Sequence, residues 1–186
     1  MNTSPHKTLT HSPLFRAEDP QTVNRWRTAD DRVMGGESVA HMAWENQNGK
    51  NPGMEQGLCL RGRVSLANRG GFIQIKWPVT AGDLVNIDGY TGLYIHAMGN
   101  GEAYNLHLRT RWLWLPWQSY RQTFHAQPQP HYHYFPFDAF EPYKTATPFA
   151  PRQLKTIAVV AIGRAFTADV CVREMGFYTR LGDTLD

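Results

Sequence analysis

The sequence of 186 residues contains only two cysteines, Cys59 and Cys171. Two cysteines so far apart are no disulfide framework of the kind that holds small secreted domains together. Each lies in an alternating apolar run, so we expect two reduced thiols in the core. Charged residues are scarce as well, at 19% against 41% hydrophobic residues. This composition indicates a globular protein with a core of ordinary size.

Long apolar segments are also absent. No stretch approaches the roughly eighteen apolar residues that cross a bilayer as a helix. The first twenty residues lack the apolar segment of a secretory signal. We predict a flexible lead-in over residues 1–20, one domain over residues 21–180 and a tail over residues 181–186. We expect the protein in the bacterial cytoplasm, either free or peripheral to the inner membrane.

No part of the chain stands out as a basic cluster. Nineteen Lys and Arg face sixteen Asp and Glu, which leaves a formal net charge of +3. Proteins that bind nucleic acids usually gather Lys and Arg on one face or along one helix. We therefore predict no nucleic-acid partner.

Aromatic residues, glycine and proline are plentiful. The chain has 12% aromatic residues, six Trp, 16 Gly and 12 Pro, a composition that favours strands and turns. About ten short segments with period-two alternation are separated by turn residues, and no segment predicts an amphipathic helix. We predict an antiparallel β-sandwich. Its strands include Gln21–Thr28, and Gly99–Glu102 is predicted to form a hairpin turn.

Two double glycines mark related motifs. Gly35-Gly36 lies within Asp30–Ser38, and Gly70-Gly71 lies within Asn68–Phe72. Such pairs are needed where the backbone takes a positive φ or where another segment comes too close for a Cβ. We predict that two strand ends meet here, with side chains of Asp31, Ser38 and Asn68 bonding the junction. Alternatively, Asp30 and Asp31 bind Ca²⁺, although the remaining oxygen ligands cannot be named.

The order of these and later motifs resembles the complex I intermediate-associated protein 30 family over about residues 24–178. The matching residues are Trp26; Asp31, Val33, Met34, Gly35, Gly36 and Ser38; Asn68, Gly70, Gly71 and Phe72; Asp88, Gly89, Tyr90, Gly92 and Leu93; Gly99, Gly101, Tyr104, Leu106, Leu108, Arg109 and Thr110; and Tyr120, Phe124, Pro136, Phe137, Phe140, Ile162 and Gly163.

The resemblance implies a galactose-binding-like jelly-roll sandwich, similar to carbohydrate-binding modules. It also implies a chaperone-like binding protein without catalysis, with a respiratory-complex subunit as its partner. A fold transfers between relatives more safely than a role. The family residues Asp31, Met34, Gly35, Gly36, Ser38, Asn68, Gly70, Gly71 and Phe72 are therefore interpreted as structural.

A tryptophan-rich segment, Arg111–Gln118, separates two predicted strands. Trp112, Trp114 and Trp117 in a loop would expose apolar surface, which usually marks a contact site for a protein or a sugar ring. The alternative is that the strands are longer and that Trp112 and Trp114 lie on a buried face. Asn105, His107 and Arg109 alternate with apolar neighbours, so they line either a groove beside this loop or an ordinary solvent face.

Residues for catalysis or for binding a metal cannot be assembled with conviction. His131 and His133 have the spacing of two metal ligands on one strand face, and His107 or His125 would be the third ligand. We interpret the pair instead as the polar face of an aromatic strand. No nucleophile–base order and no phosphate-binding loop is found. We predict no cofactor, no metal and no enzyme activity. The leading hypothesis is a protein-binding domain, and the alternative is a carbohydrate-binding module that uses Asn105, His107, Arg109, Trp112, Trp114 and Trp117.

Overall fold

The computed structural model describes residues 8–45, 57–69 and 71–180. Gly70, nearly all of the predicted loop Asn46–Gly57 and the tail 181–186 lie outside the described residues.

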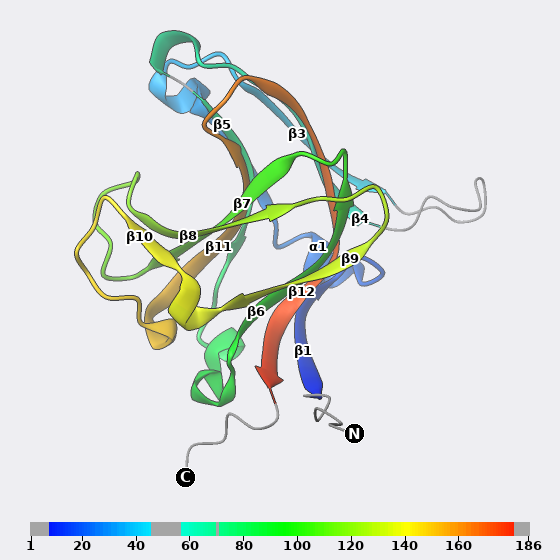
Figure 1. Ribbon diagram of the computed structural model, residues 1–186, viewed down its shortest axis with the longest axis vertical. Coiled ribbons are helices and arrows are strands. Elements are labelled where there is room, and N and C mark those ends of the chain that lie inside the picture. Colours follow the sequence, from blue (N-terminus) through cyan, green and yellow to red (C-terminus); the bar gives the residue numbers. More distant parts are fainter. Residues whose placement is uncertain (1–7, 46–56, 70, 181–186) are drawn as a thin grey trace, which may run out of the picture.

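Two antiparallel sheets pack face to face (Figure 1). Sheet A contains β1 (Leu9–Arg16), β3 (Val39–Glu45), β4 (Gly57–Val64), β6 (Gly92–Gly99), β9 (His131–Pro136) and β12 (Phe166–Arg180). Sheet B contains β2 (Arg27–Asp30), β5 (Phe72–Pro78), β7 (Ala103–Thr110), β8 (Ser119–His125), β10 (Glu141–Tyr143) and β11 (Leu154–Ile162). The predicted antiparallel sandwich is confirmed.

The strand order explains where the core lies. Sheet A runs β3-β4-β12-β6-β9, with β1 also paired to β12, and sheet B runs β10-β8-β7-β11-β5-β2. Alternate residues of each strand point between the sheets, as period-two side-chain geometry requires. Leu106, Val159 and Ile75 from sheet B and Leu60 and Ile95 from sheet A are fully buried there.

Helical segments are short. In the part of the chain that the structure describes they are α1 (Pro20–Val23) and six 3₁₀ turns: η1 (Asp31–Met34), η2 (Ala67–Arg69), η3 (Gly82–Leu84), η4 (Ile87–Gly89), η5 (Phe137–Ala139) and η6 (Pro151–Gln153). Among the described residues, no helix has the length and apolar character needed to cross a membrane.

The N-terminal part of the prediction needs correction. β1 lies inside the segment 1–20 that the sequence presents as a lead-in, and it pairs with β12 from Leu9↔Arg180 to Arg16↔Glu174. Polar residues and a proline at positions 10–13 hide its alternation. The segment Gln21–Thr28 is also not one strand. Asp19 caps α1 by accepting a hydrogen bond from the Gln21 N–H at 3.0 Å, and β2 begins only at Arg27.

The predicted hairpin at Gly99–Glu102 is wrong as well. The turn itself is present, with Gly101 at φ 81°, but β6 belongs to sheet A and β7 to sheet B. The turn residues bond to other segments, because Gly99 donates to the carbonyl of Gln127 at 2.7 Å and Gly101 to that of Ala126, also at 2.7 Å. Turn residues in a sequence predict that the chain reverses its direction. They do not predict whether the next strand joins the same sheet.

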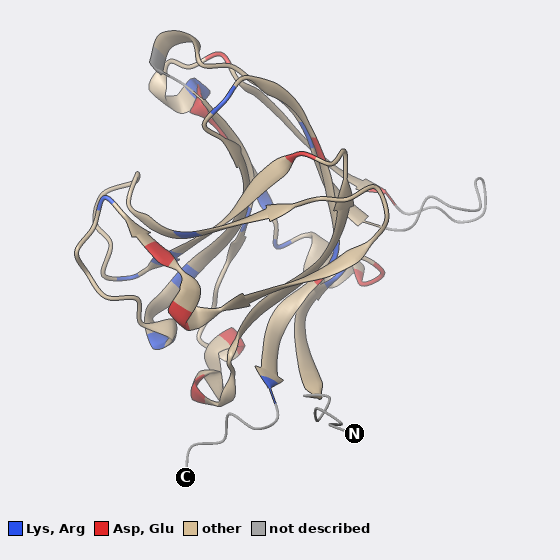
Figure 2. Ribbon diagram, viewed as in Figure 1, with Lys and Arg blue, Asp and Glu red and all other residues tan. Residues whose placement is uncertain are grey.

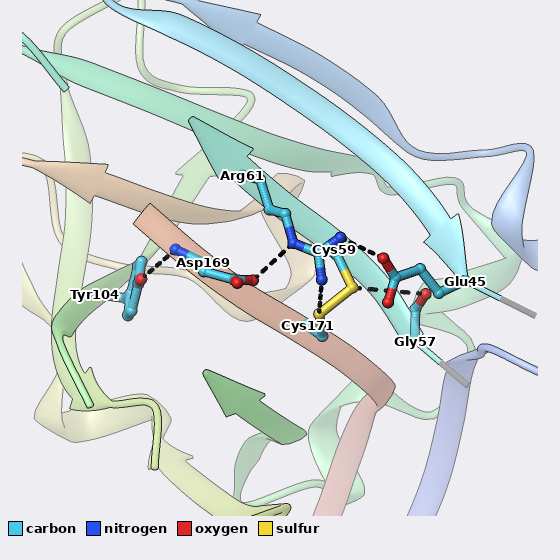
Figure 3. Close-up of a disulfide and its surroundings, with 7 residues drawn as sticks. All are labelled: Glu45, Gly57, Cys59, Arg61, Tyr104, Asp169 and Cys171. Carbon is cyan, nitrogen blue, oxygen red and sulfur yellow. Dashed lines mark hydrogen bonds and ion pairs between the residues drawn. A yellow bond between two sulfur atoms is a disulfide. The ribbon is translucent and has the colours of Figure 1, made fainter. Parts of the chain in front are cut away.

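The two cysteines form a disulfide rather than two reduced thiols (Figure 3). Cys59 of β4 and Cys171 of β12 are opposite each other in the strand register, with Cα atoms 3.9 Å apart. Arg61 lies beside them, with Nε 3.0 Å from an Asp169 oxygen and with a second ion pair to Glu45. The apolar patterns around each cysteine predicted strands, but they could not reveal that these strands are neighbours.

Candidate binding surface

The double-glycine junction is organised around Asp31, a fully buried carboxylate. It accepts hydrogen bonds from the Ser38 N–H at 2.9 Å, the Ser38 hydroxyl at 2.5 Å, the Gly71 N–H at 2.5 Å and the Phe72 N–H at 3.3 Å. Burial by itself raises the pKa of Asp31, but these donors outweigh it and hold the pKa below its usual value. One side chain thus ties η1 to the approach to β3 and to the start of β5.

The glycines of the first motif allow this carboxylate to sit where it does. A Cβ on Gly36 would lie 2.3 Å from Cγ of Asp31, a distance that no packed structure tolerates. Gly35 ends η1 in the left-handed region, at φ 85°. Because the oxygens of Asp31 are used by protein donors and Asp30 pairs with Arg32 at 2.8 Å, the Ca²⁺ alternative gains no support.

Two other motif residues behave differently from the prediction. Asn68 donates to the Glu37 side chain at 3.2 Å and not to the backbone of the junction. Met34 is exposed, as is its neighbour Val33, so neither contributes to the core. Gly70 cannot be placed in this account because it lies outside the described residues.

The tryptophan-rich segment is an exposed loop. β7 ends at Thr110 and β8 begins at Ser119, so the strands do not extend through the loop. The exposed fractions are 48% for Trp112, 91% for Trp114 and 52% for Trp117. Only Leu113 turns inward, with 5% exposed. The alternative of a buried strand face is therefore wrong for Trp112 and Trp114, while their role in binding stays a prediction.

The backbone of this loop is held at several points. The Arg109 guanidinium donates to the carbonyl oxygens of Pro116 and Leu113, the latter at 3.4 Å. The side chain of Gln118 accepts from the Leu115 N–H at 3.1 Å and donates to the carbonyl of Lys144, also at 3.1 Å. A loop that is already ordered loses less conformational entropy on binding. The backbone that carries the three indole rings is thus held by hydrogen bonds before any partner binds.

Asn105, His107 and Arg109 share the outer face of sheet B, since Tyr104, Leu106 and Leu108 point into the core. Their side chains have separate partners and do not form one hydrogen-bonded group. The Asn105 side chain accepts from the Thr123 hydroxyl at 3.1 Å, and Arg109 supports the loop as described above.

His107 is the most deeply buried of the three. Burial, with a smaller effect of the Arg121 charge, lowers the pKa of His107 to about 3. Its Nε2 atom is buried, and no hydrogen-bond partner for it is found in the described part of the chain. The imidazole is therefore neutral at physiological pH, and it adds no positive charge to this face.

Arg121 and Tyr143 are two further residues of sheet B that the sequence analysis did not single out. Arg121 is opposite His107 in the register of β7 and β8. Its Cζ lies 3.5 Å from the ring centroid of Tyr143, and its Nε donates to the Ser119 hydroxyl at 2.9 Å. We call Trp112, Trp114, Trp117, Arg109, Arg121 and Tyr143 together the Trp-loop surface.

A sequence signal for this surface does exist, in the distribution of acids. Residues 103–137 contain no Asp or Glu, yet they include Arg109, Arg111 and Arg121. Asp138 and Glu141 are the only acids between residues 103 and 168. Figure 2 shows β8 and β10 on the left, where red marks η5 and β10, and Glu141 of β10 is opposite Arg121 of β8 in the register. The overall charge of the chain hides this asymmetry.

The histidine pair does not assemble a metal site. Nδ1 of His131 lies 2.8 Å from the carbonyl oxygen of Gln129, and the centroid of the His133 ring lies 5.0 Å from that of the Phe124 ring. Within the described ranges, the one group of three potential ligands close enough to share an ion is Glu45, Cys59 and Cys171. Both sulfurs of that group are bonded to each other.

Comparisons with known proteins agree on family and fold. The model of the family described as complex I intermediate-associated protein 30 matches residues 15–169. No curated protein matches. A family 11 carbohydrate-binding module of a cellulosomal cellulase of Clostridium thermocellum has a TM-score of 0.70 and 7% identity, covering 91% of this chain and 95% of that one. A family 30 carbohydrate-binding module has a TM-score of 0.56 and 10% identity, with 86% and 84% covered. An exo-beta-agarase has a TM-score of 0.58 and 8% identity over 92% of this chain, but only 25% of its own.

Proposed function

The chain belongs to the complex I intermediate-associated protein 30 family, and from this premise we propose that it is a non-catalytic binding protein. In the proposal it acts like a chaperone during assembly of respiratory complex I. It holds a subunit through the Trp-loop surface and works peripherally at the inner membrane. Membership of the family suggests the assembly role, and the Trp-loop surface suggests where the partner binds.

The observation that carries the proposal is the anchored loop with three exposed indole rings. Trp, Tyr and Arg dominate the binding energy of protein interfaces, especially where they cluster. The loop combines Trp114, 91% exposed, with the Arg109 hydrogen bonds that fix its backbone. Exposing large rings to water is unfavourable for an isolated protein, so a partner that covers them explains their position.

Gene deletion and complementation test this proposal. Deletion is expected to lower complex I activity in membranes, and the wild-type gene is expected to restore it. The variant Trp114→Ala/Trp117→Ala should fold normally but fail to restore activity. Tyr132→Ala, which removes an exposed ring from sheet A on the opposite side of the sandwich, is the control. Intact complex I after deletion would refute the assembly role.

Carbohydrate binding is the second candidate, and the fold likeness favours it. A family 11 module from Clostridium thermocellum, solved with a beta-1,3-1,4-mixed-linked tetrasaccharide, has a TM-score of 0.63 and 8% identity. Exposed Trp rings are also suited to stacking on sugars. Titration with that tetrasaccharide and a glycan array should then show binding that Trp114→Ala abolishes. Absence of any binding would remove this candidate and leave the first untouched.

A further inference from the structure

We propose that Cys59, Cys171 and Glu45 form a zinc site when the disulfide between the two cysteines is reduced. In the oxidised chain the sulfurs are bonded to each other and do not coordinate a metal. In the reduced chain two thiolates and one carboxylate bind the ion, and a water molecule is the fourth ligand. The inference goes beyond the proposed function. It follows from the positions of three side chains and from the space around them.

Both cysteines lie on the outer face of sheet A. Their neighbours along β4 and β12 point into the core, namely Leu58, Leu60, Val170 and Val172. Side chains alternate along a strand, so the two sulfurs lie on the other face. Glu45 is the last residue of β3, the strand that pairs with β4. One ligand atom from each of Glu45, Cys59 and Cys171 lies within 4.8 Å of the other two (Figure 3). Three neighbouring strands thus supply three ligands of the types that zinc binds.

The spacing of the two strands suits a bridging ion as well as a disulfide. Zinc binds thiolates at about 2.3 Å in tetrahedral geometry, which places two of its sulfur ligands about 3.8 Å apart. The Cα atoms of Cys59 and Cys171 are 3.9 Å apart, and the residues are directly opposite in the register. After reduction, rotation about the two Cα–Cβ bonds therefore separates the sulfurs to that distance without movement of either strand.

Small residues border the two sulfurs. Gly57 is opposite Glu45 in the register of β3 and β4, and a Cβ on this glycine would lie 3.2 Å from Cβ of Cys171. Ala43 is opposite Cys59 in the same register. Neither Gly57 nor Ala43 has a side chain beyond Cβ, so neither fills the space between the Glu45 carboxylate and the sulfurs.

Arg61 balances the charge of the reduced site. Its guanidinium pairs with Glu45 and Asp169, and its Nη2 atom lies 4.0 Å from Sγ of Cys171. A cation in this position favours the thiolate over the thiol. Two thiolates and one carboxylate carry three negative charges, which the zinc ion and the guanidinium together neutralise. Arg61 keeps Asp169 as its partner when the Glu45 carboxylate turns to the ion.

The disulfide determines whether the metal binds. A cellular dithiol is the reductant: it donates two electrons and two protons through a mixed disulfide, so that it becomes a disulfide while Cys59 and Cys171 become thiols. Zinc binding then forms two Zn–S bonds and releases both thiol protons to water. In the reverse direction, the disulfide of that carrier takes two electrons from the thiolates and two protons from water. The bond between Cys59 and Cys171 forms again, and the ion leaves.

Titration with cobalt(II) and zinc tests the inference with the full chain. The protein is reduced with a phosphine, separated from it by gel filtration without oxygen, and titrated with cobalt(II), whose sulfur-to-cobalt charge-transfer absorption reports thiolate ligands. We expect this absorption in the reduced chain, its loss when zinc displaces cobalt, and none in the oxidised chain. The zinc affinity measured by this competition should fall about tenfold or more in Glu45→Gln. Asp169→Asn is the matched control, because it removes the other acid that pairs with Arg61 but no ligand, and it should bind zinc as the wild type does.

Three results would overturn the zinc site. The first is a reduced chain without charge-transfer absorption, whether it is folded or unfolded by circular dichroism. The second is an unchanged zinc affinity in Glu45→Gln, or an equal loss in Glu45→Gln and Asp169→Asn, which would assign the effect to Arg61 and not to a carboxylate ligand. The third is zinc binding of the same affinity in urea that unfolds the chain, because two cysteines would then bind the ion without the sheet.

Discussion

At the scale of single residues, Asp31 acts as a joint because every donor around it is fixed by the backbone or by Ser38. Gly36→Ala tests this, since its Cβ would lie 2.3 Å from Cγ of Asp31 and must displace the carboxylate. We expect a loss of about 2–4 kcal/mol in the free energy of unfolding, measured by urea titration. Gly89→Ala is the matched control, because its Cβ would meet nothing within 4 Å. A similar loss of unfolding free energy in the two variants would contradict this role of Asp31.

His107 makes the stability of the fold depend on pH. Its pKa is about 3 in the folded chain, against an ordinary value near 6.5 in the unfolded chain. The unfolded state therefore binds the extra proton between these values, so the stabilisation is complete above about pH 6.5 and is lost as the pH falls toward 3.

We predict that the wild type loses about 1–2 kcal/mol more than His107→Gln between pH 7 and pH 5. Urea titrations at the two pH values measure this difference. The pKa of His133 is also lowered by burial, but His133 is present in both chains and cancels. Carboxylates with lowered pKa values, such as Asp31, remain ionised over this range. If the free energy of unfolding changed equally with pH in the wild type and in His107→Gln, the folded chain would have to protonate His107 as readily as the unfolded chain.

At the scale of elements, the sequence predicts strands better than it predicts their partners. Alternation located most of β4, β5, β7 and β8, because one face of each strand is buried. It missed β1, whose apolar pattern is interrupted, and it joined β6 to β7 across a turn that separates the sheets. The Trp loop was predicted from its composition. Arg121 was missed because its place between His107 and Glu141 is set by the sheet register.

The disulfide gives a prediction at this same scale. It closes a loop between β4 and β12 with a sequence separation of 112 residues, and a loop of that length constrains the unfolded chain strongly. Reduction should lower the free energy of unfolding by about 2–4 kcal/mol, as measured by urea titration with and without a phosphine reductant. Cys59→Ala/Cys171→Ala should be insensitive to the reductant. Two thiols titrated in the native, unreduced chain would contradict the bond.

This disulfide also bears on where the protein works. Disulfides persist mainly in oxidising compartments and are rare in the cytoplasm. The cytoplasmic location expected from the sequence stays a prediction, and the redox state of Cys59 and Cys171 in the cell is a way to test it. Trapping free thiols in intact cells with an alkylating reagent, followed by a mass measurement, decides between a reduced and an oxidised pool.

At the scale of the whole molecule, the last of the described strands, β12, lies at the centre of sheet A. β12 pairs with β1 at the start of the chain and with β4 and β6 from its middle. Such pairings between distant segments carry the entropy cost of closing long loops, which slows folding. Sheet A cannot be complete without residues 166–180, because β12 joins β1, β4 and β6.

A chain that ends at Ala165 is therefore expected not to fold. It would lose the central strand and with it the buried side chains of Val170, Val172 and Phe177, which leaves β1 and β4 without a common neighbour. Circular dichroism and urea titration should show no cooperative transition. The control ends at Arg180 and keeps every pairing of β12. A cooperative transition in the shorter chain would mean that sheet B, with the Trp loop that it carries, forms a stable unit without the centre of sheet A.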